Sequence, residues 1–517
     1  MHDGEVITQR LPRSVPRQPD LTTPIYGALA GALLMTALVA VWYLGWKTIG
    51  LPFPPFDVFD WFVRALPGGF VTRVIELNVV VGRALGASSI GSAAKIADQI
   101  MAVCGVIAAG TLLGAVLFAL ARLSGEPPGF LGLVIGGAAG GLVVVAEISL
   151  ARVPTGTTRG YAPGVWVIVT LAAWGILLGR VFQQLRDAPA AHADRGVDPP
   201  RRRFLLRFVR IAALTTAATT VAGVVVGRLR KAALGARWSE DHALPNAASP
   251  VAPVRGTRAE FTPLEDHYRI DTNTRPPDLD GDRWRLIVGG LVNRPLVLSL
   301  AQIRELPATH QFITLSCISN PVGGDLIGTT RWTGVGLQQL LLMCGGVGPS
   351  ATHLRVTSAD GFYEVVSVEA VRSDPRVMLT YAWDGVPLTT EHGYPLRLYV
   401  PDLYGMKQPK WITGIEAIDH WEPGFWVARG WDREGHVRTT AAVDAVVRRG
   451  DVTEVGGFAY AGARGISRVE VRADEGEWQQ ALIREPMSGT TWVIWRTEFR
   501  LPPGQHRFEV RAAEAGT

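Results

Sequence analysis

One cysteine stands at the beginning of a glycine-containing loop. Cys317 lies in the stretch TLSCISNPVGGD, directly after an apolar run, and the 517 residues contain only three cysteines. A cysteine in such a place can be a nucleophile, a metal ligand or a small core residue, and the residues alone leave these roles open. A single thiolate suits a soft metal whose other ligands belong to a cofactor.

Basic and imidazole side chains gather in a second stretch, EHGYPLRLYVPDLYGMKQPKW. His392, Arg397, Lys407 and Lys410 lie there among strand and loop residues. Proteins hold phosphate groups with such donors, because arginine offers a bidentate fork and lysine a point charge. Taken alone, the group is also typical of a solvated surface. Together with Cys317, it indicates a candidate cofactor site.

Long apolar runs occupy the N-terminal half of the chain. Each is long enough at helical rise to cross a hydrocarbon core, and the first four carry only two charged residues, Glu147 and Arg180. Buried soluble helices are the alternative. We predict a membrane domain over 1–231 with spans at 24–46, 99–121, 129–151, 163–185 and 209–227.

A further apolar segment, 60–86, is interrupted by four charged residues. They are Arg64, Arg73, Glu76 and Arg83. Charges at this spacing are costly in lipid, so the segment is typical of an amphipathic helix that lies at the membrane interface.

Positive charge is distributed unevenly around the spans. Arginines occur in the N-terminal tail and in a cluster before the fifth span: Arg10, Arg13, Arg17, Arg201, Arg202, Arg203, Arg207 and Arg210. The positive-inside rule places both groups in the cytoplasm, so the fifth span delivers the rest of the chain to the outer side. The basic residues behind the net charge of +5 therefore follow the pattern of membrane topology, and we expect membrane lipid and no nucleic acid as a partner.

The arginine cluster contains the pattern Arg-Arg-x-Phe-Leu at 201–205. This is similar to an internal twin-arginine signal, which exports folded domains, and a stop-charge cluster beside a helix is the alternative. The five spans contain no histidine and the chain has no Cys-x-x-Cys-His motif, so we expect neither a bis-histidine haem in the membrane nor a c-type haem. The spans predict an anchor or a docking site.

The composition changes after residue 231. Residues 232–262 are rich in Ala, Pro and Ser without periodicity, and predict a linker. Short strands and one short helix predict an α+β domain over 263–437, with an alternating pattern already at 267–273. Over 438–517 the pattern is nearly all strand, which predicts an immunoglobulin-like β-sandwich.

A series of motifs follows in order from about residue 260. They are HYRIDTN, WRLIVGGLVNRPLVLSL, TLSCISN, RWTGVGL, DGVPLTTEHGYPLRLYVPDLYGMKQPKW and GFWVARGW. In these motifs the chain resembles the sulfite oxidase family of molybdopterin enzymes, which implies a molybdenum–molybdopterin cofactor. The last segment, ISRVEVRADEGEWQQA, is similar to the family's C-terminal sandwich domain and implies a possible homodimer.

The resemblance assigns roles to individual residues. Cys317 matches the cysteine that ligates molybdenum, alongside two dithiolene sulfurs of one pterin and oxo groups. The positions that match cofactor-binding residues are Tyr268, Asn273, Asn320, His392, Arg397, Lys407 and Lys410.

Some positions depart from the family pattern. Animal and plant sulfite oxidases carry an arginine where this chain has the sequence Pro-Val-Gly-Gly at 321–324, which argues against sulfite as the substrate. Trp431 replaces the active-site tyrosine of the family, and tryptophan donates a hydrogen bond without acting as a phenolic acid. Arg331 and Trp332, after the cysteine loop, line the substrate entrance or have a structural role.

These features lead to one principal hypothesis and two alternatives. The chain is expected to be a multi-pass membrane protein with an extracytoplasmic molybdopterin oxidoreductase domain, which transfers an oxygen atom to or from a small oxyanion or an S- or N-oxide. Electrons would pass to a separate cytochrome or quinone-linked carrier. The alternatives are a non-enzymatic binding module on a degenerate molybdopterin scaffold, and a reductase of oxidised methionine or another sulfoxide.

Overall fold

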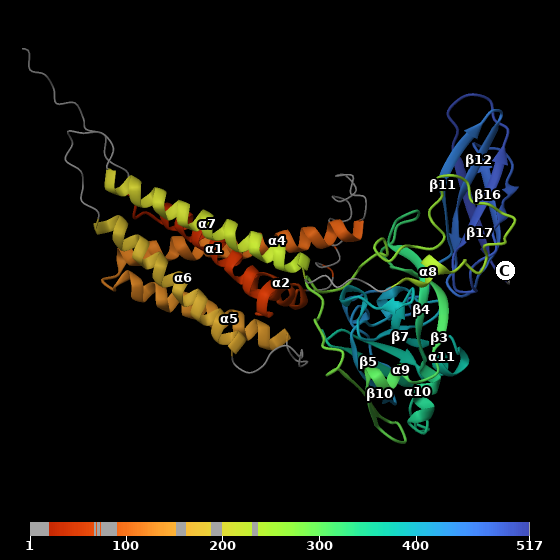
Figure 1. Ribbon diagram of the computed structural model, residues 1–517, viewed down its shortest axis with the longest axis horizontal. Helices are drawn as coiled ribbons and strands as arrows, with labels where there is room; N and C mark the ends of the chain where they lie inside the picture. The colour runs from red at the N-terminus through yellow and green to blue at the C-terminus, as the bar shows by residue number, and fades with distance from the viewer. Residues whose placement is uncertain are drawn as a thin grey trace, which may run out of the picture. The chain divides into compact units, whose positions relative to one another are not determined.

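The computed structural model describes residues 20–66, 69, 73, 90–150, 162–187, 199–229 and 236–515 (Figure 1). The chain divides into two compact units. One comprises Met1–Pro55, Met101–Ala146 and Gly160–Lys231, and the other comprises Phe56–Ile100, Glu147–Arg159 and Ala232–Thr517.

Five long helices contain the apolar runs. They are α1 (Pro24–Ile49), α4 (Ile90–Leu123), α5 (Pro128–Leu150), α6 (Ala162–Asp187) and α7 (Pro199–Leu229). Each contains a stretch long and apolar enough to cross a membrane, so the five predicted apolar helices are confirmed among the described residues, while the bounds of the spans stay a prediction. α1 begins at a proline, which suits the first helical turn, and ends at Gly50, whose φ of 72° is left-handed.

Glycines bring α1 and α4 into close contact. A Cβ atom on Gly114 would lie 2.3 Å from the carbonyl oxygen of Gly27, and one on Gly31 would lie 2.4 Å from that of Gly110. Only glycine lets the two backbones approach this closely. Small residues of this kind are typical of contacts between membrane helices, where close van der Waals packing replaces the hydrophobic effect.

The segment predicted at 60–86 is described mainly at its beginning. α2 (Pro54–Ala65) buries Asp60 and exposes Trp61 and Phe62. Apart from Gly69 and Arg73, residues 67–89 lie outside the described part of the chain, so the interfacial helix stays a prediction.

The α+β region of the second unit contains two sheets. In the first, the strand order is β2 (Leu296–Ser299), β1 (Arg285–Gly290), β10 (Ile412–Ile418), β5 (His353–Ser358), β6 (Tyr363–Ser367). β1 and β10 are parallel and the other neighbours are antiparallel. β5 and β6 form a hairpin, which turns at Gly361 with a φ of 81°.

The second sheet positions the cysteine loop. Its order is β3 (Thr309–Ser316), β4 (Ile327–Gly336), β7 (Met378–Trp383), β8 (Val386–Pro387), and β9 (Arg397–Tyr399) pairs with β7. β3 and β4 are antiparallel, so the loop between them is closed at Ser316 and Ile327. The predicted short helix is α10 (Leu337–Met343), which is followed by two glycines with positive φ, Gly345 and Gly346.

Short helices join these strands. They are α9 (Leu300–Arg304), α11 (Val368–Ser373), η1 (Thr390–His392), η2 (Gly405–Lys407) and η3 (Val427–Arg429). Leu286, Val288 and Leu340 belong to one buried apolar core that the first sheet shares with α9, α10 and α11.

The C-terminal region consists of two antiparallel sheets. One has the order β11 (Thr440–Arg449), β12 (Val452–Tyr460), β16 (Val493–Phe499), β15 (Leu482–Ile483), and the other β14 (Gln479–Gln480), β13 (Ile466–Ala473), β17 (Phe508–Glu514). Val455, Val471 and Trp495 from both sheets share one buried core, as in a sandwich. The immunoglobulin-like topology stays a prediction.

The residues predicted as a linker pack against the β regions from residue 236 onward. The amide of Trp238, in α8 (Trp238–Asp241), donates to the carbonyl of Asp384 at 2.8 Å. Asn246 and Glu260 are buried, and Arg484 Nε donates to a carboxylate oxygen of Glu260 at 2.9 Å. This ion pair joins residues 224 positions apart, which composition does not reveal.

The alternating segment 267–273 is irregular instead of forming a strand. The Lys95 ammonium group donates to the carbonyl oxygens of Asp271 and Asn273, at 2.7 and 2.9 Å. These carbonyls are thus satisfied by a side chain, which is why the segment needs no neighbouring strand.

We predict that Gly114→Ala destabilises the helical unit, because its Cβ would collide with the Gly27 carbonyl of α1. Overpacking of this kind costs about 1–3 kcal/mol. Gly105→Ala is the matched control on α4, since a Cβ there meets nothing within 4 Å. The thermal midpoint of the full chain in detergent should fall for Gly114→Ala and hold or rise for Gly105→Ala. Equal midpoints would contradict the close packing.

Candidate cofactor site

Cys317 lies directly after β3, in a loop held by short-range hydrogen bonds. Its amide donates to the carbonyl of Leu326 at 2.9 Å, and its carbonyl accepts from the Asn320 amide at 3.0 Å. The side-chain oxygen of Asn320 accepts from the Leu326 amide at 2.9 Å. Asn320 therefore closes the loop around the cysteine. Burial raises the pKa of the Cys317 thiol, which favours its neutral form unless a cation binds there.

Tyr268 lies beside the cysteine in the same buried core. Its side chain is 9% exposed, and its hydroxyl approaches the loop at Gly405 so closely that a Cβ there would lie 3.0 Å away. Burial and the neighbouring Cys317 raise the pKa of Tyr268 well above its ordinary value, so its hydroxyl stays protonated.

The rings of two histidines and two tryptophans lie close together in the interior of the domain. The rings of His267 and His392 lie 5.7 Å apart, the His267 ring lies 5.8 Å from that of Trp332, and the His392 ring lies 4.3 Å from that of Trp383. The Nε2 atoms of both histidines and the indole nitrogens of both tryptophans are buried without a hydrogen-bond partner among the described residues. Such unpaired groups are rare in native interiors, and they mark a place where a polar ligand fits.

Arg397, the first residue of β9, adds a buried cation to this group. Its guanidinium donates to the carbonyl of His392 at 3.2 Å and lies 4.9 Å from the centre of the Trp332 ring. Burial lowers the pKa of Arg397 to about 10, so it remains charged at neutral pH. Burial and the nearby Arg397 lower the pKa of His267 to about 3, so that histidine is neutral.

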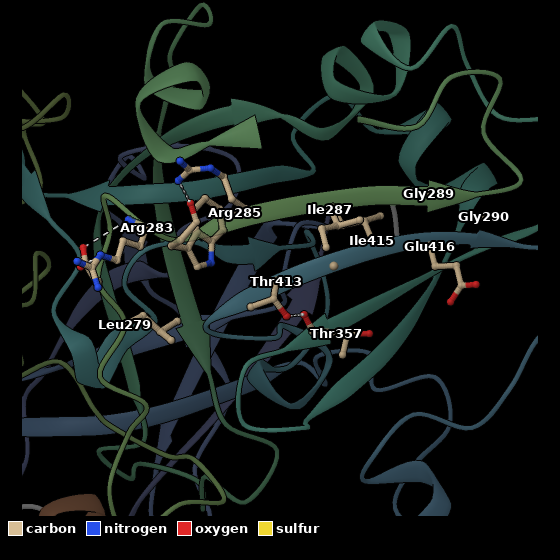
Figure 2. A pocket seen from close by; sticks show the side chains of 13 residues that line it. Leu279, Arg283, Arg285, Ile287, Gly289, Gly290, Thr357, Thr413, Ile415 and Glu416 are labelled. Atoms are coloured by element: carbon tan, nitrogen blue, oxygen red, sulfur yellow. Dashed lines mark hydrogen bonds and ion pairs between the residues drawn. The ribbon is translucent and has the colours of Figure 1, made fainter. Parts of the chain in front are cut away.

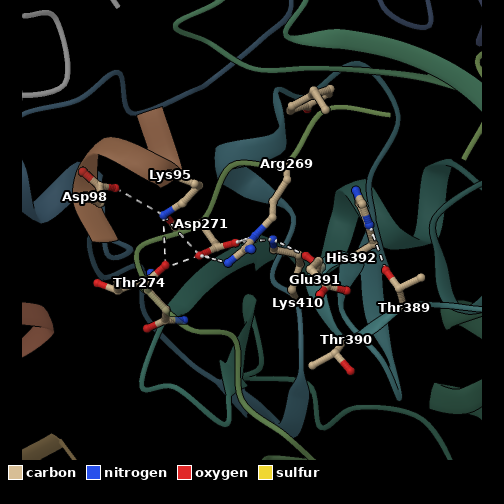
Figure 3. Close-up of polar contacts among 12 residues, drawn as sticks. Lys95, Asp98, Arg269, Asp271, Thr274, Thr389, Thr390, Glu391, His392 and Lys410 are labelled. Atoms are coloured by element: carbon tan, nitrogen blue, oxygen red, sulfur yellow. Dashed lines mark hydrogen bonds and ion pairs between the residues drawn. The ribbon is translucent and has the colours of Figure 1, made fainter. Parts of the chain in front are cut away.

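Lys410 is the second buried cation. Its ammonium group lies 3.3 Å from a carboxylate oxygen of Asp271 and donates to the carbonyl of Glu391 at 2.9 Å (Figure 3). Burial lowers the pKa of Lys410 to about 8, against the opposing effect of Asp271. Lys410 in turn lowers the pKa of His392, after burial and the neighbouring His267. The predicted cofactor residues His392, Arg397 and Lys410 therefore belong to one cluster.

This cluster fits a molybdopterin. The pterin's polar edge would satisfy the unpaired histidine and tryptophan donors, and its phosphate would compensate Arg397 and Lys410. The buried thiol of Cys317 supplies the soft ligand that molybdenum requires.

Other predicted residues have different surroundings. Lys407 is buried in an ion pair with Glu364, at 2.8 Å. Asn273 donates to a carboxylate oxygen of Asp360 at 2.7 Å. These partners orient the two side chains within the domain, and cofactor binding by Lys407 and Asn273 stays a prediction.

The two further residues predicted as catalytic also have aromatic neighbours. The Arg331 guanidinium lies 5.0 Å from the centre of the Trp238 ring, in α8. The ring of Trp431 lies 4.5 Å from that of Trp426. Their roles at the substrate entrance stay predictions.

The sequence motifs did not single out His267, Trp383 or Asp271. His267 directly precedes the predicted Tyr268 and begins the motif HYRIDTN, which is the signal for it in the sequence. Trp383 and Asp271 become site residues through contacts across 9 and 139 positions, with His392 and Lys410.

A separate hollow lies over β1 and β10. It has a volume of about 580 Å³ and is lined by residues that include Arg283, Ile287, Thr413 and Glu416 (Figure 2). Its lining shares no residue with the buried cluster, so we do not assign the cofactor to it.

Comparison with known proteins identifies the family of this domain. The model of the oxidoreductase molybdopterin-binding domain matches residues 273–426. The uncharacterised oxidoreductase YuiH of Bacillus subtilis is 30% identical over 166 residues, which cover 32% of this chain and 81% of YuiH. The chain belongs to the family of molybdopterin-binding oxidoreductases. The cofactor of this family is molybdenum–molybdopterin.

Two other proteins are also similar to the chain. Mitochondrial sulfite oxidase of Homo sapiens is 28% identical over 284 residues, covering 45% of this chain and 52% of that protein. The chain thus spans about half the length of the mitochondrial sulfite oxidases it matches. A putative protein-methionine-sulfoxide reductase subunit, YedZ1 of Azospira oryzae, is 27% identical over 243 residues, covering 45% of this chain and 87% of that protein.

We predict a pH-dependent stability difference between the cofactor-free protein and His267→Gln. The pKa of His267 in the folded state, about 3, lies below its ordinary value of 6.5. Its contribution to stability is complete above pH 6.5 and is lost as the pH falls toward 3. The free energy of unfolding of the parent should therefore fall faster than that of the variant, by about 1 kcal/mol per pH unit. Exposed His420 gives the control, His420→Gln, and parallel curves for all three proteins would contradict the neutral buried histidine.

Proposed function

We propose that this chain is a membrane-anchored molybdenum–molybdopterin oxidoreductase that transfers an oxygen atom to or from a small substrate. One observation carries the proposal: a buried thiol, Cys317, accompanies a cluster of buried cations and unpaired donors around His392 and Arg397. Membership in the family supports the same conclusion.

The cofactor would supply the two-electron chemistry and the oxygen-atom transfer. The residues of this chain would bind and orient it. Cys317 would hold the metal, while His392, Arg397 and Lys410 would bind the pterin and its phosphate. The buried rings of Trp332 and Trp383 exclude water from this side of the cluster.

The loop after Cys317 favours a neutral substrate. Where sulfite oxidases carry an arginine, the loop carbonyls of Gly323 and Gly324 accept hydrogen bonds from Arg258, at 3.3 and 3.1 Å. Arg258 is also paired with Asp444 at 2.7 Å, so its charge is already compensated. This arrangement favours an S-oxide over a doubly charged oxyanion, and the likeness to a putative methionine-sulfoxide reductase subunit supports the same substrate class.

Contacts near the first two spans support an outer location for the catalytic domain. The positive-inside rule places the segment between these spans on the outer side, and the fifth span delivers the domain to that side as well. Lys95, at the beginning of the second span, contacts Asp271 of the domain, which requires both to lie on one side. We propose export of the folded domain through the twin-arginine pattern at 201–205, with cofactor loading in the cytoplasm.

The remaining parts of the proposal concern partners and domains. The catalytic domain would extend over 263–437 and an immunoglobulin-like domain over 438–517, which would provide a surface for a homodimer. Electrons would pass to a separate cytochrome or quinone-linked carrier. The competing proposal, a non-enzymatic binding module, requires that the buried cluster hold no metal.

Molybdenum content separates these two proposals. The full chain, purified from cells that make molybdopterin, should contain about one molybdenum per chain if Cys317 is the protein ligand. Cys317→Ser should lose most of the metal or change its visible absorption, because a hydroxyl is a harder ligand than a thiolate. Cys104→Ser, in α4, should match the parent. A folded parent without molybdenum would favour the binding module.

The substrate class is tested with paired assays. We expect reduction of sulfoxides by a reduced dye to be at least about tenfold faster, in kcat/KM, than oxidation of sulfite by an acceptor. The reason is that sulfite finds no cation in the loop at 321–324, and a missing hydrogen bond to a charged group costs about 1.5–3 kcal/mol, which lowers its kcat/KM about ten- to hundred-fold. Faster sulfite oxidation would show that a cation outside the 321–324 loop binds the substrate.

A further inference from the structure

Two segments near the membrane spans contact the cofactor domain. α2 and the first turns of α4 belong to the same compact unit as this domain. Three of their side chains, Asp60, Arg64 and Lys95, contact the segment 271–274. The family model begins at residue 273, so these three side chains lie outside the molybdopterin-binding domain itself.

Lys95 makes the most extensive of these contacts. Besides its hydrogen bonds to the carbonyls of Asp271 and Asn273, its ammonium group lies 3.4 Å from the Asp271 carboxylate and 3.7 Å from that of Asp98 (Figure 3). The Lys95 side chain is only 12% exposed. An ammonium group so enclosed is worth more than a surface ion pair, because water screens it less.

α2 holds the next two residues of the same segment. The Thr274 amide donates to a carboxylate oxygen of Asp60 at 2.8 Å, and Arg64 donates to the side-chain oxygen of Asn273. Arg64 also donates to the carbonyl of Asp360 at 2.6 Å. The segment 271–274 is therefore fixed on one side by polar side chains that precede the domain in the sequence.

Asp271 connects these contacts with the cofactor cluster. Its carboxylate is 2% exposed, and Arg269, Lys410 and Lys95 approach it to 2.8, 3.3 and 3.4 Å. Burial alone would raise the pKa of Asp271, but the three cations outweigh that effect and hold it well below its usual range. The carboxylate is thus a permanent anion that orients Lys410 through one of its oxygens, while Lys95 lies nearest to the other.

We propose that α2 and residues 90–100 form a latch on the cofactor domain, in which Lys95, Arg64 and Asp60 position Asp271 and, through it, Lys410. The latch rests on the proposed function in one respect, that Lys410 binds the cofactor phosphate. When Lys95 is removed, Asp271 loses one of three compensating cations and its carbonyl loses a donor. The anion can then draw Lys410 away from the phosphate, which weakens retention of the cofactor.

Cofactor retention in the full chain tests the positioning role. After gel filtration in detergent, Lys95→Ala should retain several-fold less molybdenum and pterin per chain than the parent, and Lys95→Arg should restore most of it, because arginine keeps the charge. Arg122→Ala, which removes an exposed cation from the other end of α4, should equal the parent. Equal retention in Lys95→Ala and the parent would overturn the positioning role, since a purely structural contact predicts that result.

Hydrogen exchange tests the latch without any cofactor. In the cofactor-free chain, the Thr274 amide should exchange at least about tenfold faster in Asp60→Ala than in the parent, because its acceptor is gone. Asp60→Asn keeps an acceptor oxygen and should stay closer to the parent. Unchanged exchange in Asp60→Ala would show that the latch does not form.

The two measurements also separate this inference from the proposed function. A parent without molybdenum would refute the proposed function and the positioning role together, while hydrogen exchange would still decide whether the latch exists. A molybdenum-loaded parent with unchanged exchange and retention in the variants would refute the latch and leave the proposed function intact.

Discussion

Buried positive charge requires a buried partner, and this constraint governs the cofactor domain. Arg397 and Lys410 are charged and largely enclosed, and the Nε2 atoms of the neutral histidines beside them, His267 and His392, are buried without hydrogen-bond partners among the described residues. Asp271 compensates Lys410 only from one side. A phosphate-bearing ligand would compensate the positive charge of Arg397. Without such a ligand, the burial of these cations would lower the free energy of unfolding.

Local sequence patterns predicted the parts of this site that depend on neighbours along the chain. The strand that ends at Ser316, the loop that begins with Cys317 and the helix that ends before Gly345 all follow from apolar runs and glycine positions. The five long apolar helices followed from hydropathy. The alternating pattern at 267–273 predicted a strand, and this prediction was wrong. The carbonyls of Asp271 and Asn273 bind the distant Lys95, so the segment needs no strand partner.

Partners distant in sequence decide the roles that a motif leaves open. Lys407 and Lys410 lie three residues apart in one basic stretch, and the motif treats them alike. Lys407 is neutralised by Glu364, whereas Lys410 shares Asp271 with two other cations. The motif therefore located the cofactor cluster, but only the positions of the two carboxylates distinguish a lysine held within the domain from one directed at a ligand.

The latch and the membrane topology constrain each other. The segment between the first two spans is made and inserted before the cofactor domain is synthesised, and the domain would cross the membrane later, already folded around its cofactor. In the proposed topology, Lys95 and Asp271 would therefore meet only after export. If loading precedes that contact, the latch cannot assist cofactor entry and can only oppose its loss on the outer side, where no replacement cofactor is made. This order of events would give the membrane half a role beyond anchoring, because the proposed orientation places Lys95 on the same side of the membrane as the cofactor domain.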